Sequence, residues 1–137
     1  MIESVFFSFT FCTTTIDMPR QILVVDNDEL YVMLVREVFT MKGHSVLSAS
    51  NGAEALKILE SNPVDLIVSD VEMPVMDGLE FHSRVRQDPR FQSTPFAFLS
   101  GTTRLEILRE LRKKKDVVLV NKAEMVDRLL SLFGDIL

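Results

Sequence analysis

The sequence contains little of several things, and each shortage excludes a class of protein. It has no Trp, a single Cys, and only five Gly and five Pro among 137 residues. One Cys cannot form an internal disulfide, which excludes a disulfide-stapled scaffold and fits a reducing compartment. So few Gly and Pro exclude collagen-like and low-complexity chains. Basic residues are outnumbered 15 to 20 by acidic ones and form no large block, which argues against direct nucleic-acid binding.

What is present is ordinary for one globular domain. The chain is 47% hydrophobic and 26% charged, with a net charge of −5. Folding of a chain of this length buries roughly two-thirds of its extended surface, so the core needs neither a disulfide nor a structural metal. We therefore expect one cytoplasmic domain over residues 19–137, without membrane association.

The first 18 residues differ in character from the rest. Their apolar stretch, Val5–Cys12, is far shorter than the roughly 20 residues that span a bilayer. The only early charge is Glu3, whereas a secretory signal begins with basic residues. Alternate positions are apolar as in a strand, namely Val5, Phe7, Phe9 and Phe11. Two interpretations remain open: a leader ahead of a true start at Met18, or an extra strand that pairs at a sheet edge or across a homodimer.

From Gln21 onward, short apolar runs alternate with segments of helical periodicity. Five runs are predicted strands, at residues 22–25, 46–49, 64–69, 96–99 and 117–120. Apolar residues at helical spacing predict a helix after each strand. The fourth helix carries Leu105, Leu108 and Leu111, and the last carries Val126, Leu129, Leu130, Phe133 and Leu137. This alternation predicts an α/β fold, a doubly wound five-stranded parallel sheet with helices on both faces.

Four polar residues follow the predicted strands at their carboxyl ends, where such sheets bind ligands. They are Asp26, Asp70, Ser100 and Lys122. Carboxylates suit Mg²⁺ together with a phosphoryl group, and an Asp can itself attack phosphorus. A Lys and a hydroxyl can then neutralise and hydrogen-bond the transferred group. The edge of the sheet is therefore a candidate phosphoryl-transfer site.

The chain resembles the receiver domain of bacterial response regulators, the targets of histidine kinases in two-component signalling. The resemblance extends over about 115 residues. It is carried by ILVVDNDE at 22–29, LIVSDVEMPVMDG at 66–78, Ser100-Gly101 and Lys122. It implies the flavodoxin-like strand order 2-1-3-4-5 that is known for members of this family.

The resemblance also implies roles for individual residues. Asp70 would be the phosphoacceptor, with Ser100 and Lys122 drawn toward the phosphoryl group. Mg²⁺ would be held by Asp26, Asn27, Asp70 and the backbone carbonyl of Glu72. We expect a phosphorylation switch rather than an enzyme. Its partners would be a sensor histidine kinase or phosphotransfer protein, and an unidentified downstream protein that binds the surface of the fourth helix, fifth strand and fifth helix.

Three positions depart from the family pattern. Asn27 replaces a carboxylate and should weaken the metal site, and Asp28 beside it is predicted to cap the next helix. Leu119 occupies the aromatic switch position, and Ala123 stands where Pro is usual, which puts a cis peptide in doubt. These departures support an alternative, a pseudo-receiver that binds partners without phosphorylation. A second alternative is a phosphatase of the haloacid-dehalogenase type that uses Asp26 in a D-x-D pattern.

Overall fold

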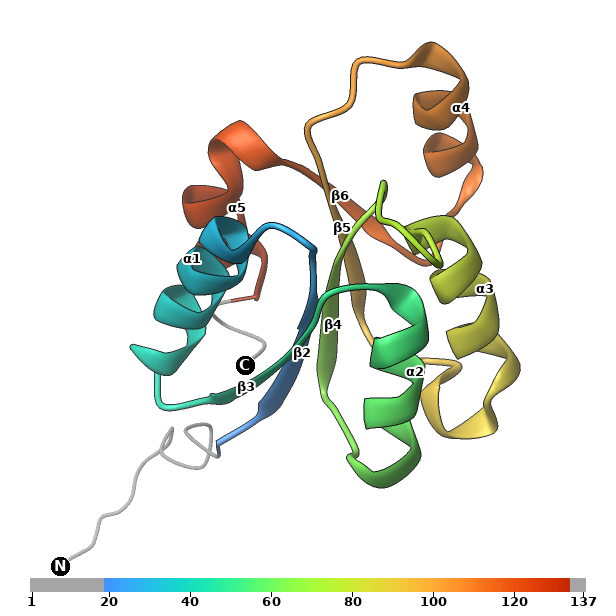
Figure 1. Cartoon of the computed structure of the whole chain (residues 1–137). Coiled ribbons are helices and arrows are strands. Elements are labelled where there is room, and N and C mark those ends of the chain that lie inside the picture. Colours follow the sequence, from blue (N-terminus) through green and yellow to red (C-terminus); the bar gives the residue numbers. More distant parts are fainter. Residues whose placement is uncertain (1–18, 134–137) are drawn as a thin grey trace, which may run out of the picture.

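The computed structural model describes residues 19–133, and its centre is a five-stranded sheet (Figure 1). All pairs of neighbouring strands are parallel, and the order is β3-β2-β4-β5-β6. The strands are β2 (Gln21–Val25), β3 (Ser45–Ala49), β4 (Leu66–Asp70), β5 (Phe96–Ser100) and β6 (Val118–Asn121). Counted along the chain from β2, this is the order 2-1-3-4-5, so the predicted fold is confirmed.

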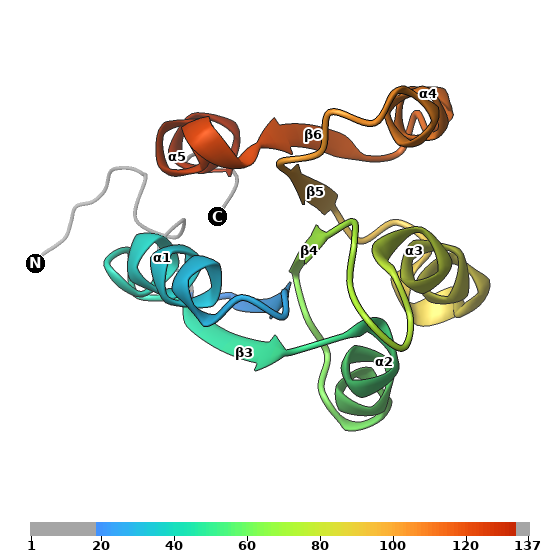
Figure 2. The ribbon, with the colours of Figure 1, turned by 45° about the horizontal axis from the view of Figure 1, so that its top comes forward.

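Helices cover both faces of the sheet (Figure 2). One face carries α1 (Glu29–Thr40) and α5 (Met125–Phe133). The other carries α2 (Gly52–Ser61), α3 (Gly78–Gln87) and α4 (Leu105–Lys113). Two short 3₁₀ helices, η3 (Pro89–Phe91) and η4 (Lys122–Glu124), complete the connections.

The two helical layers create two hydrophobic cores that share the sheet. Ile22 and Val24 of β2 point into the core beneath α1 and α5, while Leu23 and Val25 point into the opposite core. All four side chains are fully buried. A central parallel strand has no solvent-facing side, which explains why it reads as an unbroken apolar run rather than an alternating one.

Local capping bonds fix where the helices begin. Asp28 accepts a hydrogen bond from the backbone N–H of Leu30 at 3.0 Å, which confirms its predicted role as the α1 cap. Asn51 caps α2 in the same way, through the backbone N–H of Glu54 at 2.9 Å. Asp77 caps α3, although the sequence indicated only a loop there. Each cap satisfies one of the backbone donors that a helix start leaves free.

The loop between β4 and α3 is tightly folded against the end of β4. The backbone N–H of Gly78 donates to the carbonyl of Val71 at 2.8 Å. A Cβ at Gly78 would lie 2.1 Å from the carbonyl oxygen of Asp70, so only glycine permits this approach. Val75, in the same loop, adopts a φ of 69°, a strained conformation for a β-branched residue.

The apolar side chains at helical spacing in α4 and α5 are more exposed than expected for residues that face a core. In α4, Leu111 is buried but Leu105 is 63% exposed. The reason is position: α4 lies beyond the edge strand β6, so only part of it reaches the sheet (Figures 1 and 2). In α5, Leu129 is buried whereas Val126 and Leu130 are exposed by about 40%. The predictions for the side chain of Phe133, for Leu137 and for residues 1–18 lie outside the described residues.

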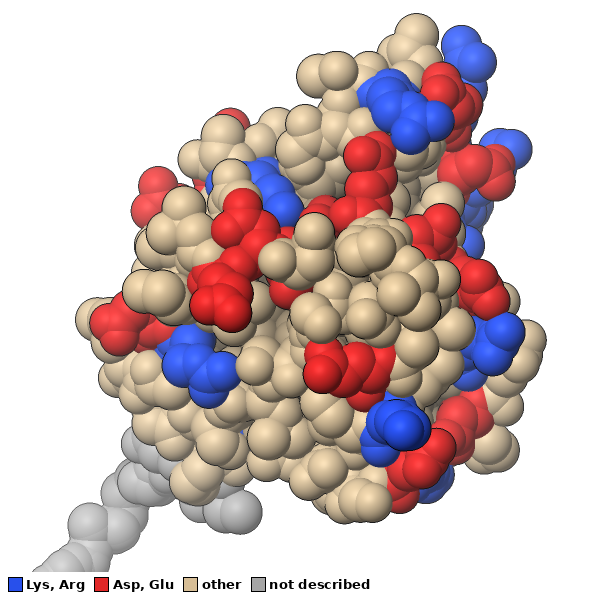
Figure 3. All heavy atoms as spheres, viewed as in Figure 1, with Lys and Arg blue, Asp and Glu red and all other residues tan. Residues whose placement is uncertain are grey.

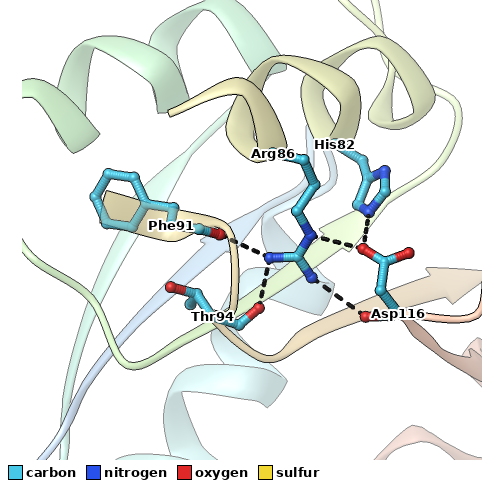
Figure 4. Close-up of polar contacts among 5 residues, drawn as sticks. All are labelled: His82, Arg86, Phe91, Thr94 and Asp116. Carbon is cyan, nitrogen blue, oxygen red and sulfur yellow. Dashed lines mark hydrogen bonds and ion pairs between the residues drawn. The ribbon is translucent and has the colours of Figure 1, made fainter. Parts of the chain in front are cut away.

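A polar network fastens α3 to the segment that precedes β6 (Figure 4). The Arg86 Nε donates to Asp116 Oδ2 at 2.6 Å, and His82 Nε2 lies 2.8 Å from the same oxygen. The Nη1 of Arg86 also donates to the backbone carbonyls of Phe91 and Thr94, both at 2.8 Å. One guanidinium thereby joins α3 to the connection that follows it and to Asp116, which lies 30 residues further along the chain.

Burial and hydrogen bonding shift the pKa values of His82 and Asp116 in this network. It lowers the pKa of His82, and the neighbouring Asp116 only partly offsets it. For Asp116, burial alone would raise the pKa, but the bonds from Arg86 and His82 prevail and lower it to about 2. His82 also packs edge-on against Phe96, with ring centroids 4.9 Å apart. His82 therefore serves in packing and in fastening α3 to Asp116.

Candidate phosphoryl-transfer site

Strand register brings the predicted site residues together at one edge of the sheet. Val25 pairs with Ser69, so Asp26 and Asp70 emerge side by side from β2 and β4. Ser100 ends β5 beside them, and its partner Asn121 immediately precedes Lys122. Four residues separated by up to 96 positions thus share one site.

An ammonium group joins the two carboxylates. Lys122 Nζ lies 2.9 Å from Asp26 Oδ2 and 3.3 Å from Asp70 Oδ2. Asp26 is only 2% exposed and Asp70 9% exposed, so these charges are largely removed from water. Two carboxylates with one ammonium leave a net negative charge, which favours a further cation at this edge.

Backbone donors hold the remaining polar atoms in place. Asp70 Oδ1 accepts from the N–H of Val71 at 2.7 Å, and Asp26 Oδ1 accepts from the N–H of Asp28 at 2.9 Å. The second oxygen of each carboxylate faces Lys122. Ser100 Oγ accepts from the N–H of Thr102 at 3.1 Å. The carboxylates are therefore oriented before any ligand binds.

The electrostatic balance differs between the two ends of the ion pair. Burial raises the pKa of Asp70, and the nearby carboxylate of Asp26 raises it further, while Lys122 acts in the opposite direction. For Lys122, burial alone would lower the pKa, but the two carboxylates together outweigh it and the pKa is raised. Lys122 accordingly stays charged, and Asp70 is more basic than an ordinary Asp.

A cavity of about 290 Å³ opens at this edge, with walls that include Tyr31, Asp70, Glu72, Ser100, Thr102 and Lys122. The Tyr31 ring centroid lies 4.1 Å from Lys122 Nζ, a cation–π contact that supports the ammonium from α1. Sequence reasoning missed this role of Tyr31, because nothing local to residue 31 indicates a partner in η4. Such a cavity can admit a phosphoryl group against Asp70.

The oxygen atoms of the site fit a hard cation such as Mg²⁺. Asp26 Oδ2 is buried and accepts no hydrogen bond of regular geometry from the described residues, so it retains a free lone pair. Asn27 and Glu72 are exposed; Asn27 directly follows Asp26, and Glu72 lies two residues after Asp70. Within residues 19–133, no group of three or more Asp, Glu, His or Cys side chains could hold a metal. Asn27, which follows Asp26 directly, carries an amide rather than a carboxylate.

The other two positions that depart from the family pattern, Leu119 and Ala123, lie nearby. Leu119 is half-buried on β6 and lines a second cavity of about 370 Å³, together with Ser100, Thr102 and Leu111. That cavity separates α4 from the sheet. No peptide bond in the described part of the chain is cis, so the bond between Lys122 and Ala123 is trans.

The family sequence model described as "Response regulator receiver domain" matches residues 22–133. The chain belongs to this family. Receiver domains of two-component systems act as phosphoacceptor signalling modules, interact with histidine kinases or phosphotransfer proteins and typically bind Mg²⁺. The paired carboxylates, lysine and hydroxyl of the site are the groups that a phosphoacceptor requires.

Individual relatives agree with the assignment. The receiver domain is 44% identical over 70 residues to the alkaline phosphatase synthesis transcriptional regulatory protein PhoP of Bacillus subtilis, covering 51% of this chain and 29% of PhoP. The chemotaxis response regulator CheY4 of Vibrio cholerae is 29% identical, with a TM-score of 0.77 over 88% of this chain and all of that one. The Mn²⁺-bound response regulator Rcp1 shares the fold at 21% identity, with a TM-score of 0.71 over 84% and 94% of the two chains.

The receiver domain spans less than a third of the length of PhoP. Among its described residues, no helix combines the length and apolar character needed to cross a bilayer. Acidic and basic side chains are interspersed on the face shown in Figure 3. The basic residues Arg109, Arg112 and Lys113 of α4 are exposed, and Arg112 and Lys113 lie in its last turn, the end that suits a positive charge.

Proposed function

We propose that this receiver domain is phosphorylated on Asp70 and acts as a switch in a cytoplasmic two-component phosphorelay. The observation that carries the proposal is the joint contact of Lys122 with Asp26 and Asp70, in a cavity that also contains Ser100. This arrangement places a nucleophilic carboxylate, a permanent cation and a hydroxyl around one space large enough for a phosphoryl group.

Oδ2 of Asp70, which faces Lys122 Nζ at 3.3 Å, is the proposed nucleophile, since Oδ1 accepts a hydrogen bond from the N–H of Val71. Asp70 attacks the phosphorus of a phospho-histidine, the phosphorus–nitrogen bond breaks, and the donor keeps that electron pair. Lys122 and the Ser100 hydroxyl then contact the oxygens of the new aspartyl phosphate. Asp26, Asn27, Asp70 and the backbone carbonyl of Glu72 would hold Mg²⁺, which would supply charge neutralisation for the phosphoryl oxygens.

The output surface is proposed to be α4, β6 and α5. Helix α4 is held by a single fully buried side chain, Leu111, above the cavity that Ser100 and Leu119 line. Movement of Ser100 toward the phosphoryl group therefore changes one wall of that cavity. A helix so loosely seated can change position at a small energetic cost, which is what a population shift requires.

Intact mass after incubation with acetyl phosphate and Mg²⁺ tests the proposal. The wild-type protein should gain one phosphoryl group, and neither Asp70→Asn nor a chelator-treated sample should gain any. Folded wild-type protein without an adduct would establish the pseudo-receiver. An adduct retained in Asp70→Asn but lost in Asp26→Asn would establish the D-x-D nucleophile instead.

A further inference from the structure

A third hollow of the molecule shares no lining residue with the phosphoryl-transfer site. It is a groove of about 560 Å³ between α1 and α5, lined by Leu34, Val38, Met41, Val126 and Leu130, with Glu37 and Lys42 at its rim. Met41 is 81% exposed, and no described residue covers it. An apolar hollow of this kind on a globular domain marks a site that something occupies.

The chain enters the fold beside one end of this groove. The N–H of Arg20 donates to His44 Nδ1 at 3.0 Å, and the N–H of His44 donates to the carbonyl of Phe39 at 3.1 Å. The N–H of Lys42 donates to that same carbonyl at 3.1 Å. Arg20 is thus anchored to the turn that ends α1, where Met41 and Lys42 form the mouth of the groove.

The residues ahead of Arg20 have the length and chemistry to fill it. Eighteen residues precede Pro19, and the stretch at 5–12 (VFFSFTFC) contains no charge. Phe11 is eight residues before Pro19, a reach of about 26 Å at about 3.3 Å per residue. The 12 residues of α1 extend over only about 18 Å, so the whole groove is within reach.

We propose that residues 5–12 of the same chain occupy the α1–α5 groove. A tethered segment binds at an effective concentration near millimolar, which lets a short apolar stretch compete with partners free in solution. A second copy of the chain is a weaker candidate, because stable interfaces bury about 1,200–2,000 Å² and this groove offers five apolar side chains. The proposal is independent of phosphorylation.

The single Cys of the chain, Cys12, makes the proposal testable in the full-length protein. In Met41→Cys, mild oxidation at low micromolar concentration should form an intramolecular disulfide, since that bond needs Cα atoms within about 7 Å. Ser93→Cys is the matched control, because Ser93 is exposed and lines a different hollow that Arg20 also lines. We expect the disulfide to form at least tenfold faster in Met41→Cys.

A further variant tests whether the Phe side chains of residues 5–12 bind the segment to the groove. Adding Phe7→Ser, Phe9→Ser and Phe11→Ser to Met41→Cys should lower the rate to that of the Ser93→Cys control. Equal rates in the two cysteine variants, or a rate that ignores the serine substitutions, would overturn the proposal. Disulfide-linked dimers whose rate of formation rises with protein concentration would also overturn it, assigning the groove to a second copy.

Discussion

Replacing Arg86 tests whether the network in Figure 4 stabilises the fold. The Arg86 side chain is 17% exposed, and its guanidinium contacts the Asp116 carboxylate and the backbone carbonyls of Phe91, Thr94 and Asp116. Arg86→Met keeps an unbranched aliphatic stem but removes every one of these hydrogen bonds, along with the guanidinium that lies over the Phe96 ring, 5.7 Å from its centroid. The variant therefore isolates the polar contribution of the guanidinium.

The expected loss follows from the exposure of the partners. A hydrogen bond to a charged group contributes about 1.5–3 kcal/mol, and a carbonyl left buried without a partner costs about 1–3 kcal/mol. The Asp116 side chain is 46% exposed, so water replaces part of its bond to Arg86. We expect Arg86→Met to lower the free energy of unfolding by about 2–4 kcal/mol.

Urea unfolding followed by circular dichroism measures this loss. Arg84→Met is the control two residues away: Arg84 is 51% exposed and pairs only with the equally exposed Glu80. It should change the free energy of unfolding by less than about 0.5 kcal/mol. Arg86→Lys should recover only part of the loss, because an ammonium cannot bridge the same fork of acceptors. If Arg86→Met and Arg84→Met unfold at the same urea concentration, the reasoning is wrong.

Four further predictions concern groups described above. Burial lowers the pKa of His82 from 6.5, so as the pH falls its imidazole is protonated in the unfolded chain before it is protonated in the folded chain. Urea midpoints should therefore fall as the pH drops below about 6.5, and they should fall less in His82→Gln. Asp116, with its pKa lowered from 3.8 to about 2, should add a second loss of stability below about pH 4, absent in Asp116→Asn. Val75→Gly should relieve the φ of 69° and raise the free energy of unfolding by about 1 kcal/mol in a thermal melt, whereas Val75→Ala, which keeps a Cβ, should gain less. Asn27→Asp should tighten Mg²⁺ binding about tenfold, or about 1.4 kcal/mol, in a titration of the fluorescence of Tyr31, the only Tyr; an unchanged affinity would place Asn27 outside the metal site.

The sequence by itself determined the features that depend on local physics. A strand covered on both faces must be apolar throughout, so β2 and β4 could be predicted from their composition, and parallel strands must deliver Asp26 and Asp70 to one edge. Capping chemistry is equally local, which is why Asp28 was recognisable as a helix start. The cap at Asp77 was not predicted, although its side chain caps α3 by the same chemistry.

Only the tertiary structure decided the contacts between distant segments. Nothing near residue 31 indicates that Tyr31 supports Lys122, and nothing near residue 86 indicates that Arg86 reaches Asp116. Periodicity reports that a helix has an apolar stripe, but it cannot report how much of that stripe a neighbour covers. Leu105 is therefore exposed beyond the edge of the sheet, and the groove between α1 and α5 exists because two separate stripes meet without filling the space between them.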